Sequence, residues 1–128
     1  MGIMRLYSAD MYVHDLDRAI DFYVGKLGFE KRADVPVDED GHRWVEVAPK
    51  GSETAIVLAH GFGSWGPEKV GGWSRKIFAV DDMAGTAEAL KARGVALEDE
   101  PEESPYGVYA QVRDPDGNVF GLLQEAGG

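Results

Sequence analysis

The three histidines are the first candidates for metal or acid–base chemistry, because the chain contains no cysteine. They are His14, His42 and His60, and no two of them stand at the i, i+4 spacing that places two metal ligands on one helix face. The lack of cysteine also removes thiolate metal sites, disulfides and cysteine nucleophiles. No Gly-x-Ser-x-Gly nucleophile motif is present. We therefore expect no metal site built from histidine, and the sequence assigns no catalytic residue.

Aromatic and acidic residues are concentrated in two segments that read as loops. The segment at residues 60–73 contains five glycines together with Phe62, Trp65 and Trp73. Exposed loops rarely carry such aromatic residues, so these side chains must cover a ligand, a partner subunit or the core. The acidic segment EDEPEESP at residues 98–105 is either a solvated loop or an electrostatic funnel that attracts a cationic ligand.

The overall charge limits the class of partner. With 13 Lys and Arg against 23 Asp and Glu, the 128-residue chain has a formal net charge of −10. Nucleic-acid binding depends on Lys and Arg that neutralise phosphates, so we expect no nucleic-acid partner. No apolar run approaches the roughly 18 residues that span a bilayer, and the N-terminus lacks the layout of a signal peptide. We expect a cytoplasmic protein with no membrane partner.

The secondary structure that must position these residues is predicted to occur twice along the chain. In the first copy, a strand at residues 4–13 is followed by a helix that Asp15 caps and Gly28 ends, with apolar residues at helical spacing between them. Alternating apolar residues and turn residues then predict three strands, at residues 29–37, 42–47 and 54–60.

The same order of elements returns after the aromatic segment. A strand at residues 75–80 leads into a helix that ends at Gly94. Aligning the two copies places Asp15 on Asp82 and, after one deleted residue, Gly28 on Gly94. Three further strands are predicted at residues 95–98, 108–113 and 118–124.

The repeat predicts an α+β fold of two tandem β-α-β-β-β modules. Module 1 covers residues 1–62, module 2 covers residues 72–128, and the loop at residues 60–73 links them. Neither module is large enough to bury a stable core by itself, so we expect the two to share a sheet or to pair with modules of a second chain. We therefore expect a homodimer. With the helices outside, strong twist turns the free faces of the curved sheets into a ligand trough. The trough lies within one chain or across the dimer.

Three sequence motifs add a family resemblance to this repeat: VHDLDRAIDFY at residues 13–23, LGF at residues 27–29 and DPDGN at residues 114–118. Together with the doubled β-α-β-β-β pattern, they resemble the vicinal oxygen chelate superfamily. That superfamily includes glyoxalase I, extradiol dioxygenases, fosfomycin-resistance enzymes and bleomycin-resistance proteins. The resemblance covers nearly the whole chain, and the segment at residues 106–122 looks most like the bleomycin-resistance branch.

The resemblance implies four positions at which enzymes of this superfamily hold a divalent metal through histidine or carboxylate side chains. In this sequence these positions are occupied by Ser8, Val57, Arg75 and Gly121. None of the four supplies an imidazole or a carboxylate for zinc, nickel or iron. We therefore expect no metal, no other cofactor, and neither lactoylglutathione lyase nor ring-cleaving chemistry.

Strand alternation, started from these four positions, predicts the side chains that line the trough. Trp44 is expected either to stack on a ligand or to pack in the core. Arg75 is expected either to contact a ligand or to pair with Glu46 or Asp10. The predicted ligand-binding residues are Ser8, Asp10, Tyr12, Trp44, Glu46, Val57, His60, Phe62, Trp65, Arg75, Tyr109, Gln111 and Gly121.

These observations leave two classes of function. The first is a metal-independent binding protein that, like the bleomycin-resistance proteins, sequesters an aromatic or cationic small organic molecule in a dimer trough. The second is an enzyme of the same superfamily (lyase, isomerase or dioxygenase-like) acting on a small metabolite, with acid, base or charge-stabilising groups among Asp10, Tyr12, Glu46 and Arg75. The lost metal ligands, the aromatic segment and the negative charge favour the first class.

Overall fold

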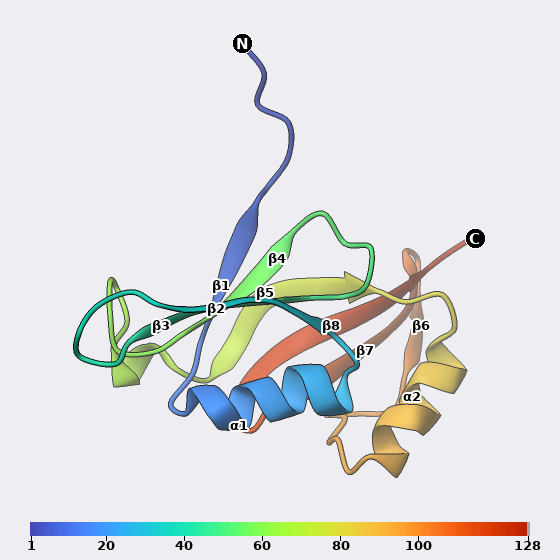
Figure 1. Ribbon diagram of the computed structural model, residues 1–128. Coiled ribbons are helices and arrows are strands. Elements are labelled where there is room, and N and C mark those ends of the chain that lie inside the picture. Colours follow the sequence, from blue (N-terminus) through green and yellow to red (C-terminus); the bar gives the residue numbers. More distant parts are fainter. Residues whose placement is uncertain (128) are drawn as a thin grey trace. The chain divides into compact units, whose positions relative to one another are not determined.

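The computed structural model describes residues 1–127 and divides into two compact units, unit 1 at Met1–Val70 and unit 2 from Gly71 onward (Figure 1). Each unit holds one four-stranded sheet, and the strand orders are β1-β4-β3-β2 and β5-β8-β7-β6. The strands that come first and last in the sequence of each unit, β1 with β4 and β5 with β8, pair in parallel. All other neighbouring strands pair antiparallel. The predicted α+β fold with two similar halves is confirmed, whereas strong curvature of the sheets stays a prediction.

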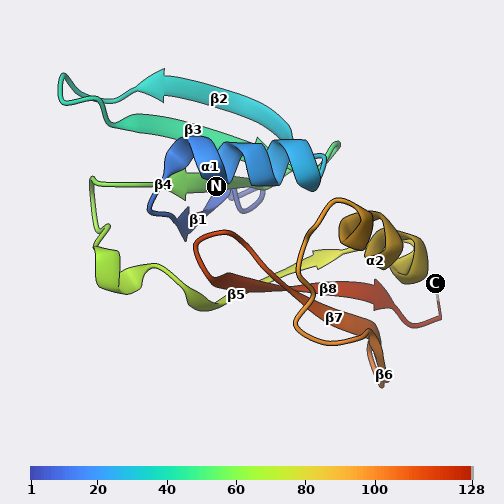
Figure 2. The same ribbon diagram turned by 90° about the horizontal axis from the view of Figure 1, so that it is seen from below.

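Unit 1 follows the predicted order of elements. The Asp15 side chain accepts a hydrogen bond from the Arg18 backbone N–H at 3.1 Å, which caps the helix as the sequence indicates. The helix continues directly into a π-helical stretch and lies along the sheet of this unit (Figure 2). The elements are β1 (Ser8–Tyr12), α1 (Leu16–Ile20), the π-helix Asp21–Lys26, β2 (Glu30–Pro36), β3 (Arg43–Ala48), β4 (Ala55–Ala59) and a short 3-10 helix (Pro67–Lys69).

Unit 2 repeats this arrangement. The Asp82 side chain accepts a hydrogen bond from the Gly85 backbone N–H at 3.1 Å and caps the second helix. None of the helices in residues 1–127 has the length and hydrophobicity needed to cross a membrane. The elements are β5 (Gly72–Ala79), α2 (Met83–Ala92), β6 (Glu102–Ser104), β7 (Gly107–Arg113) and β8 (Asn118–Glu125).

The strand predicted at residues 95–98 is wrong. Only a single bridge joins Leu97 to Val112, and the strand that follows α2 is β6, inside the acidic segment. The backbone N–H of Val95 donates to the Leu90 carbonyl at 2.9 Å, so the buried Val95 side chain belongs to the end of the helix rather than to a strand. A short run of apolar residues is too short to show a helical or strand period, so the sequence does not separate a helix end from a buried strand.

One face of the unit 1 sheet carries large buried core residues. Met11, Leu58 and Val45 are paired across β1, β4 and β3, and none is more than 2% exposed. Because side chains alternate between the two faces of a sheet, the residues between them point to the opposite face. This alternation decides which side chains remain for a binding site.

The DPDGN motif fixes the start of β8. The buried Asp114 carboxylate accepts hydrogen bonds from the backbone N–H groups of Asp116 and Asn118, both at 2.9 Å, and from the Asn118 side-chain amide at 2.9 Å. The Asn118 side-chain oxygen in turn accepts from the Gly71 N–H at 2.8 Å. The motif therefore ties the beginning of β8 to the beginning of β5 and sets the register that carries Gly121.

Gly107 is the tightest point of the β6–β7 turn. Its φ is +136°, and a Cβ there would clash with the Gln124 carbonyl oxygen and stand 2.8 Å from the Ala126 nitrogen. Both contacts are with backbone, which cannot rotate away as a side chain does. The close approach of β7 to β8 at this point requires glycine.

We predict that Gly107→Ala lowers the free energy of unfolding by about 2–4 kcal/mol, because it combines an unfavourable φ with a backbone clash. Urea unfolding followed by circular dichroism measures the loss. Gly25→Ala is the matched control, since a Cβ there meets nothing within 4 Å and the backbone φ is not positive. A loss at position 107 no larger than at position 25 contradicts this account of the turn.

Candidate functional site

Six of the predicted ligand-binding residues share one face of the unit 1 sheet. Val57 of β4 lies opposite Asp10 of β1 and opposite Glu46 of β3. Directly paired residues on neighbouring strands point to the same side, so these three side chains form a row across the sheet. Alternation along β1 and β3 completes the set, which we call the unit 1 site face: Ser8, Asp10, Tyr12, Trp44, Glu46 and Val57.

Glu46 is an enclosed carboxylate on this face, with 8% of the residue exposed. The Trp44 indole N–H donates to its Oε2 at 2.7 Å, and the Tyr7 hydroxyl donates to the same oxygen at 3.3 Å. Trp44 therefore holds a carboxylate, a role that neither of its two predicted alternatives includes. Sequence reasoning misses Tyr7, because it precedes β1 and meets Glu46 only through the pairing of distant strands.

The corresponding face of unit 2 is built around Tyr109 and Gly121. Gly121 of β8 lies opposite Ile77 of β5 and Gln111 of β7. A Cβ at Gly121 would stand 2.7 Å from the Tyr109 hydroxyl oxygen and 2.8 Å from the ring Cε1, so the phenol lies directly over this glycine. The Gln111 side-chain amide donates to the Tyr109 hydroxyl at 3.1 Å and holds the ring there.

Two hollows open beside Tyr109. The larger measures about 370 Å³ and is lined by Ile77, Glu102, Glu103, Ser104, Tyr106, Tyr109 and Leu123. The smaller measures about 180 Å³ and is lined by Asp99, Glu100, Glu102, Tyr109, Ala110 and Gln111. Tyr109 and Glu102 belong to both, so an aromatic ring and a carboxylate stand between an aromatic-aliphatic space and an acidic one. The larger hollow has the size of a pocket for a small organic molecule.

Arg75 does not follow the regular ladder of unit 2. Three residues separate Trp73 from Ile77 in β5, whereas one residue separates their partners Val119 and Gly121 in β8. Arg75 lies inside this bulge with a left-handed φ of 64°, and it is exposed. Because a bulge interrupts the two-residue period, the place of Arg75 on the site face stays a prediction.

The aromatic segment packs against the end of β1 in unit 1. The Trp65 indole N–H and His60 Nδ1 both lie 3.0 Å from the Val13 carbonyl oxygen, and their rings meet edge to face with centroids 4.7 Å apart. Since a carbonyl only accepts, His60 Nδ1 carries the proton in this contact. Phe62 lies against the His42 ring with a centroid separation of 6.0 Å. Contact of these three aromatic residues with a ligand stays a prediction.

One cluster of potential metal-binding side chains lies in the turn between β2 and β3. The ligand atoms of Asp38, Asp40 and His42 all fall within 4.8 Å of one another. Asp38 Oδ1 accepts from the backbone N–H groups of Asp40 at 2.9 Å and His42 at 3.2 Å, and Oδ2 lies 2.6 Å from His42 Nδ1. The hydrogen bond from the His42 side chain lowers the pKa of the Asp38 carboxyl. These contacts are those of an aspartate that closes a turn.

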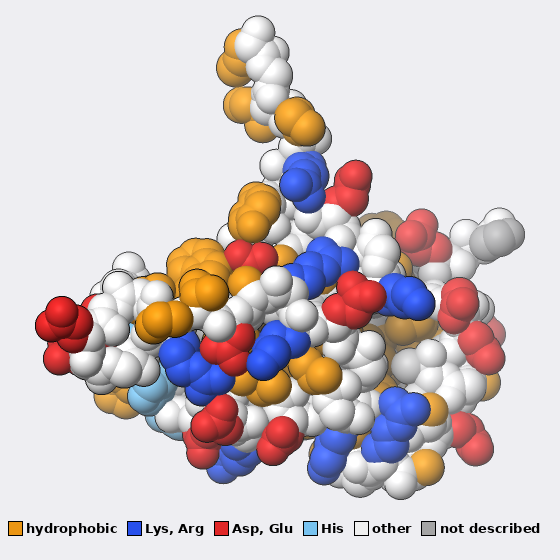
Figure 3. Space-filling model, in the orientation of Figure 1, with side chains coloured by type: hydrophobic (Ala, Val, Ile, Leu, Met, Phe, Trp, Pro, Cys, Tyr) orange, Lys and Arg blue, Asp and Glu red, His pale blue; other side chains and the backbone are white. Residues whose placement is uncertain are grey.

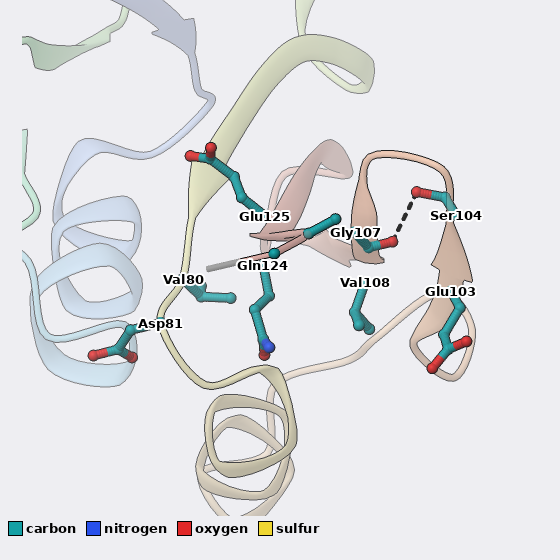
Figure 4. Close-up of a pocket in the computed structure, with 10 residues that line it drawn as sticks. Val80, Asp81, Glu103, Ser104, Gly107, Val108, Gln124 and Glu125 are labelled. Atoms are coloured by element: carbon teal, nitrogen blue, oxygen red, sulfur yellow. Dashed lines mark hydrogen bonds between the residues drawn. The ribbon is translucent and has the colours of Figure 1, made fainter.

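A third hollow, of about 800 Å³, opens on the opposite face of the unit 2 sheet. Figure 4 shows Glu103, Val108 and Gln124 side by side on the three strands that pair there. The Gln124 side-chain oxygen accepts from the Met83 backbone N–H at 2.6 Å, so this amide is committed to the start of α2. The lining contains none of the predicted ligand-binding residues: Val80, Asp81, Glu103, Ser104, Gly107, Val108, Gln124, Glu125, Ala126 and Gly127.

Comparison with known proteins gives one family and several close relatives. A sequence model described as the Glyoxalase/Bleomycin resistance protein/Dioxygenase superfamily matches residues 5–122. The uncharacterized protein YetH of Bacillus subtilis (strain 168) is 37% identical over 96% of this chain and 99% of its own length. The probable chloroplastic lactoylglutathione lyase of Arabidopsis thaliana is 34% identical over 94% of this chain, which spans 35% of that protein.

Among solved structures, TnmS3 of Streptomyces sp. CB03234 is described as an antibiotic binding protein. It matches with a TM-score of 0.84 at 39% sequence identity, covering 98% of this chain and 99% of its own. This similarity extends over nearly the whole chain.

Proposed function

The chain belongs to the Glyoxalase/Bleomycin resistance protein/Dioxygenase superfamily, and from this membership we propose that it is a metal-independent protein that sequesters an aromatic or cationic small molecule. The observation that carries the proposal is the phenol ring of Tyr109 over Gly121, at a position where enzymes of the superfamily hold a metal ligand. An aromatic surface at that position offers stacking in place of chelation. The description of TnmS3 as an antibiotic binding protein supports the same class of function.

The four expected metal-ligand positions do not fit a divalent metal. Val57 is aliphatic and 1% exposed, and the space beside Gly121 is filled by the Tyr109 ring. Ser8 carries a neutral hydroxyl, and Arg75 carries a positive charge that repels a metal ion. A metal-dependent reaction therefore has no ligand set at these positions.

The charges beside Tyr109 favour a cationic ligand over an anionic one. Asp99 and Glu102 line the smaller hollow, where Glu100 is paired with Lys91, and Glu102 also lines the larger one. A cationic ligand on the Tyr109 ring gains a cation–π contribution, and the Asp99 and Glu102 carboxylates attract it from solution. An anion at the same place is repelled, and the net charge of −10 adds to that repulsion.

We extend the proposal to a homodimer built from modules 1–62 and 72–128, with the aromatic loop 60–73 near the trough. Apolar side chains are exposed along the N-terminal segment that leads into β1, where Figure 3 shows them projecting. Ile3 and Met4 are each 86% exposed, and Leu6 is 64% exposed. Contiguous exposed apolar residues mark interaction surfaces, and a second copy of the chain supplies one.

The alternative is an enzyme of the same superfamily acting on a small metabolite. The observation that favours it is Glu46, a buried carboxylate held by Trp44 and Tyr7, because enclosed acidic groups serve as proton acceptors in active sites. The two functions differ in the fate of the ligand. A binding protein returns its ligand chemically unchanged after incubation, whereas an enzyme converts it, and mass spectrometry of the recovered ligand separates the two.

We predict that purified protein carries no stoichiometric zinc, nickel, iron or manganese, because the four expected positions supply no imidazole or carboxylate. Elemental analysis measures the metal content, and the melting temperature is expected to be the same with and without EDTA. One tightly bound metal ion per chain, or a melting temperature lowered by EDTA, contradicts the proposal.

We predict that the protein binds naphthylmethylamine more tightly than naphthylmethanol, and naphthoate least, because the three share one ring system and differ in charge. Isothermal titration calorimetry measures the affinities. Tyr109→Leu is expected to weaken the binding of all three about tenfold, since base or ring stacking on one aromatic side chain contributes about 1–3 kcal/mol. Val37→Ala is the control, because Val37 is 43% exposed and lines neither hollow. Binding confined to naphthoate overturns the proposed ligand class.

We predict a dimer in solution, with twice the 13.9 kDa mass of one chain. Light scattering at micromolar concentration measures it. The double variant Ile3→Ser, Leu6→Ser is expected to shift the population toward monomer while circular dichroism stays unchanged, because these side chains are exposed within unit 1. A wild-type protein that is monomeric throughout the concentration range refutes the dimer.

A further inference from the structure

We propose that Glu46 is the residue that recognises a positively charged nitrogen on the ligand, and that Trp44 is a positioning residue for Glu46 rather than a stacking surface. The proposal rests on the proposed function, since it assigns the charge of the ligand to one side chain of the unit 1 site face. It predicts an organic ammonium or guanidinium group as the recognised feature.

The first argument is the burial of Glu46 without a countercharge in unit 1. The residue is 8% exposed, and its hydrogen-bond donors are an indole N–H and a phenol, both neutral. Buried carboxylates are costly unless a cation balances them, and proteins therefore pair them or use them to bind a charged group. Glu46 is thus a negative charge kept in place by neutral donors.

The nearby cations of unit 1 are engaged elsewhere. The Arg43 guanidinium pairs with Asp34 at 2.7 Å and with Asp17 at 2.9 Å. The hydrogen bond from Arg43 is the main reason that the pKa of Asp34 falls to about 2. Arg5 donates to the Glu53 carbonyl oxygen at 2.6 Å, and its guanidinium carbon lies over the Tyr7 ring at 5.7 Å from the ring centroid. No Lys, Arg or His within the described part of unit 1 forms an ion pair with Glu46.

The second argument is the geometry of Trp44. Residues two apart on a strand share a face, so the indole of Trp44 lies beside Glu46 and its N–H reaches Oε2 at 2.7 Å. A charge-assisted hydrogen bond of this length fixes both side chains. Because Oε1 is 3.4 Å from the Tyr7 hydroxyl, it is the less firmly held oxygen of the two, and it remains the better acceptor for a ligand N–H.

The neighbours of Glu46 suit an ammonium group attached to an apolar carbon. Val57 lies directly beside Glu46 in the row and is 1% exposed, so an aliphatic side chain and not solvent borders the carboxylate on that side. Asp10 lies on the far side of Val57 and adds a second negative charge, but it is exposed and therefore screened by solvent. The row thus has one buried and one solvated carboxylate.

The experiment compares naphthylmethylamine with naphthylmethanol on the wild-type protein and on Glu46→Gln, by isothermal titration calorimetry. Glu46→Gln keeps the shape and an acceptor for the Trp44 N–H but removes the charge. It is expected to weaken the amine about tenfold or more, since hydrogen bonds to charged groups exceed neutral ones by about that factor. Binding of the alcohol is expected to change by less than about twofold. Glu39→Gln, an exposed glutamate in the turn between β2 and β3 and outside the site face, is the matched control and is expected to leave both ligands within about threefold of wild type.

Two measurements separate recognition from a structural role. In the absence of ligand, Glu46→Gln is expected to keep or raise the melting temperature, because it removes a buried charge; a purely structural Glu46 gives a lower one. Trp44→Phe keeps an aromatic ring but removes the N–H, and it is expected to weaken the amine while leaving the alcohol unchanged. If Trp44 is instead a stacking surface, Trp44→Phe changes the affinity for the amine and the affinity for the alcohol by the same factor.

The outcomes distinguish this inference from the function on which it rests. If the wild-type protein binds neither naphthalene, the proposed binding function fails and this assignment fails with it. If both bind but Glu46→Gln leaves the amine unchanged, the function stands and the assignment of Glu46 is overturned. A lower melting temperature for both Glu46→Gln and Arg75→Gln, with amine binding intact, identifies Arg75 as the countercharge and also overturns it.

Discussion

The parallel pairing of the first and last strand of each unit is the constraint on which the rest of the structure depends. It inserts β4 between β1 and β3, and β8 between β5 and β7. Residues far apart in the sequence then become direct neighbours, such as Asp10 and Val57 in unit 1, and Ile77 and Gly121 in unit 2. A slip of one residue in this register would turn every one of these side chains into the core. In unit 2, the hydrogen bonds within the buried Asp114–Asn118 turn fix this register.

Two contacts give the site faces their chemical character. On unit 1, the Trp44 indole N–H holds the buried Glu46 carboxylate, which leaves a fixed negative charge beside the apolar Val57. On unit 2, the Tyr109 ring covers Gly121 and stands between an apolar and an acidic hollow. The first contact joins two residues of β3, and the second joins diagonal neighbours of β7 and β8.

What the sequence predicts well is local or periodic. Asp15 and Asp82 predict the start of their helices, because an aspartate at the N-cap accepts a hydrogen bond from a backbone N–H group within three residues. The repeat of the two modules follows from such signals, and the strand order of both sheets agrees with it. The short strand β6 is missed because its residues are acidic and its pairing is imposed by β7. The strand predicted around Val95 and Leu97 is wrong, because a pair of apolar residues occurs at the end of a helix as readily as in a strand.

Other features of the site depend on three-dimensional pairing that no local pattern carries. Tyr7 reaches Glu46 only because β1, β4 and β3 lie side by side, and the packing of Tyr109 on Gly121 follows from the β7–β8 register. Arg75 falls in a bulge whose two extra residues are invisible in the alternation of β5. These contacts are set by strand pairing and by a β-bulge in the tertiary structure. They determine the chemistry of the site faces more than composition does.

The most direct test of a metal-independent, charge-recognising site is a proton–nitrogen correlation spectrum recorded while naphthylmethylamine is added. The chain has three tryptophans, so three indole N–H signals report on separate places. Because the Trp44 N–H contacts Glu46 and the Trp65 N–H contacts the Val13 carbonyl, the account predicts that the Trp44 signal shifts with EDTA present. The Trp65 signal is expected to shift less. A spectrum in which the Trp44 signal stays fixed while the amine binds, or in which binding requires added metal, would contradict it.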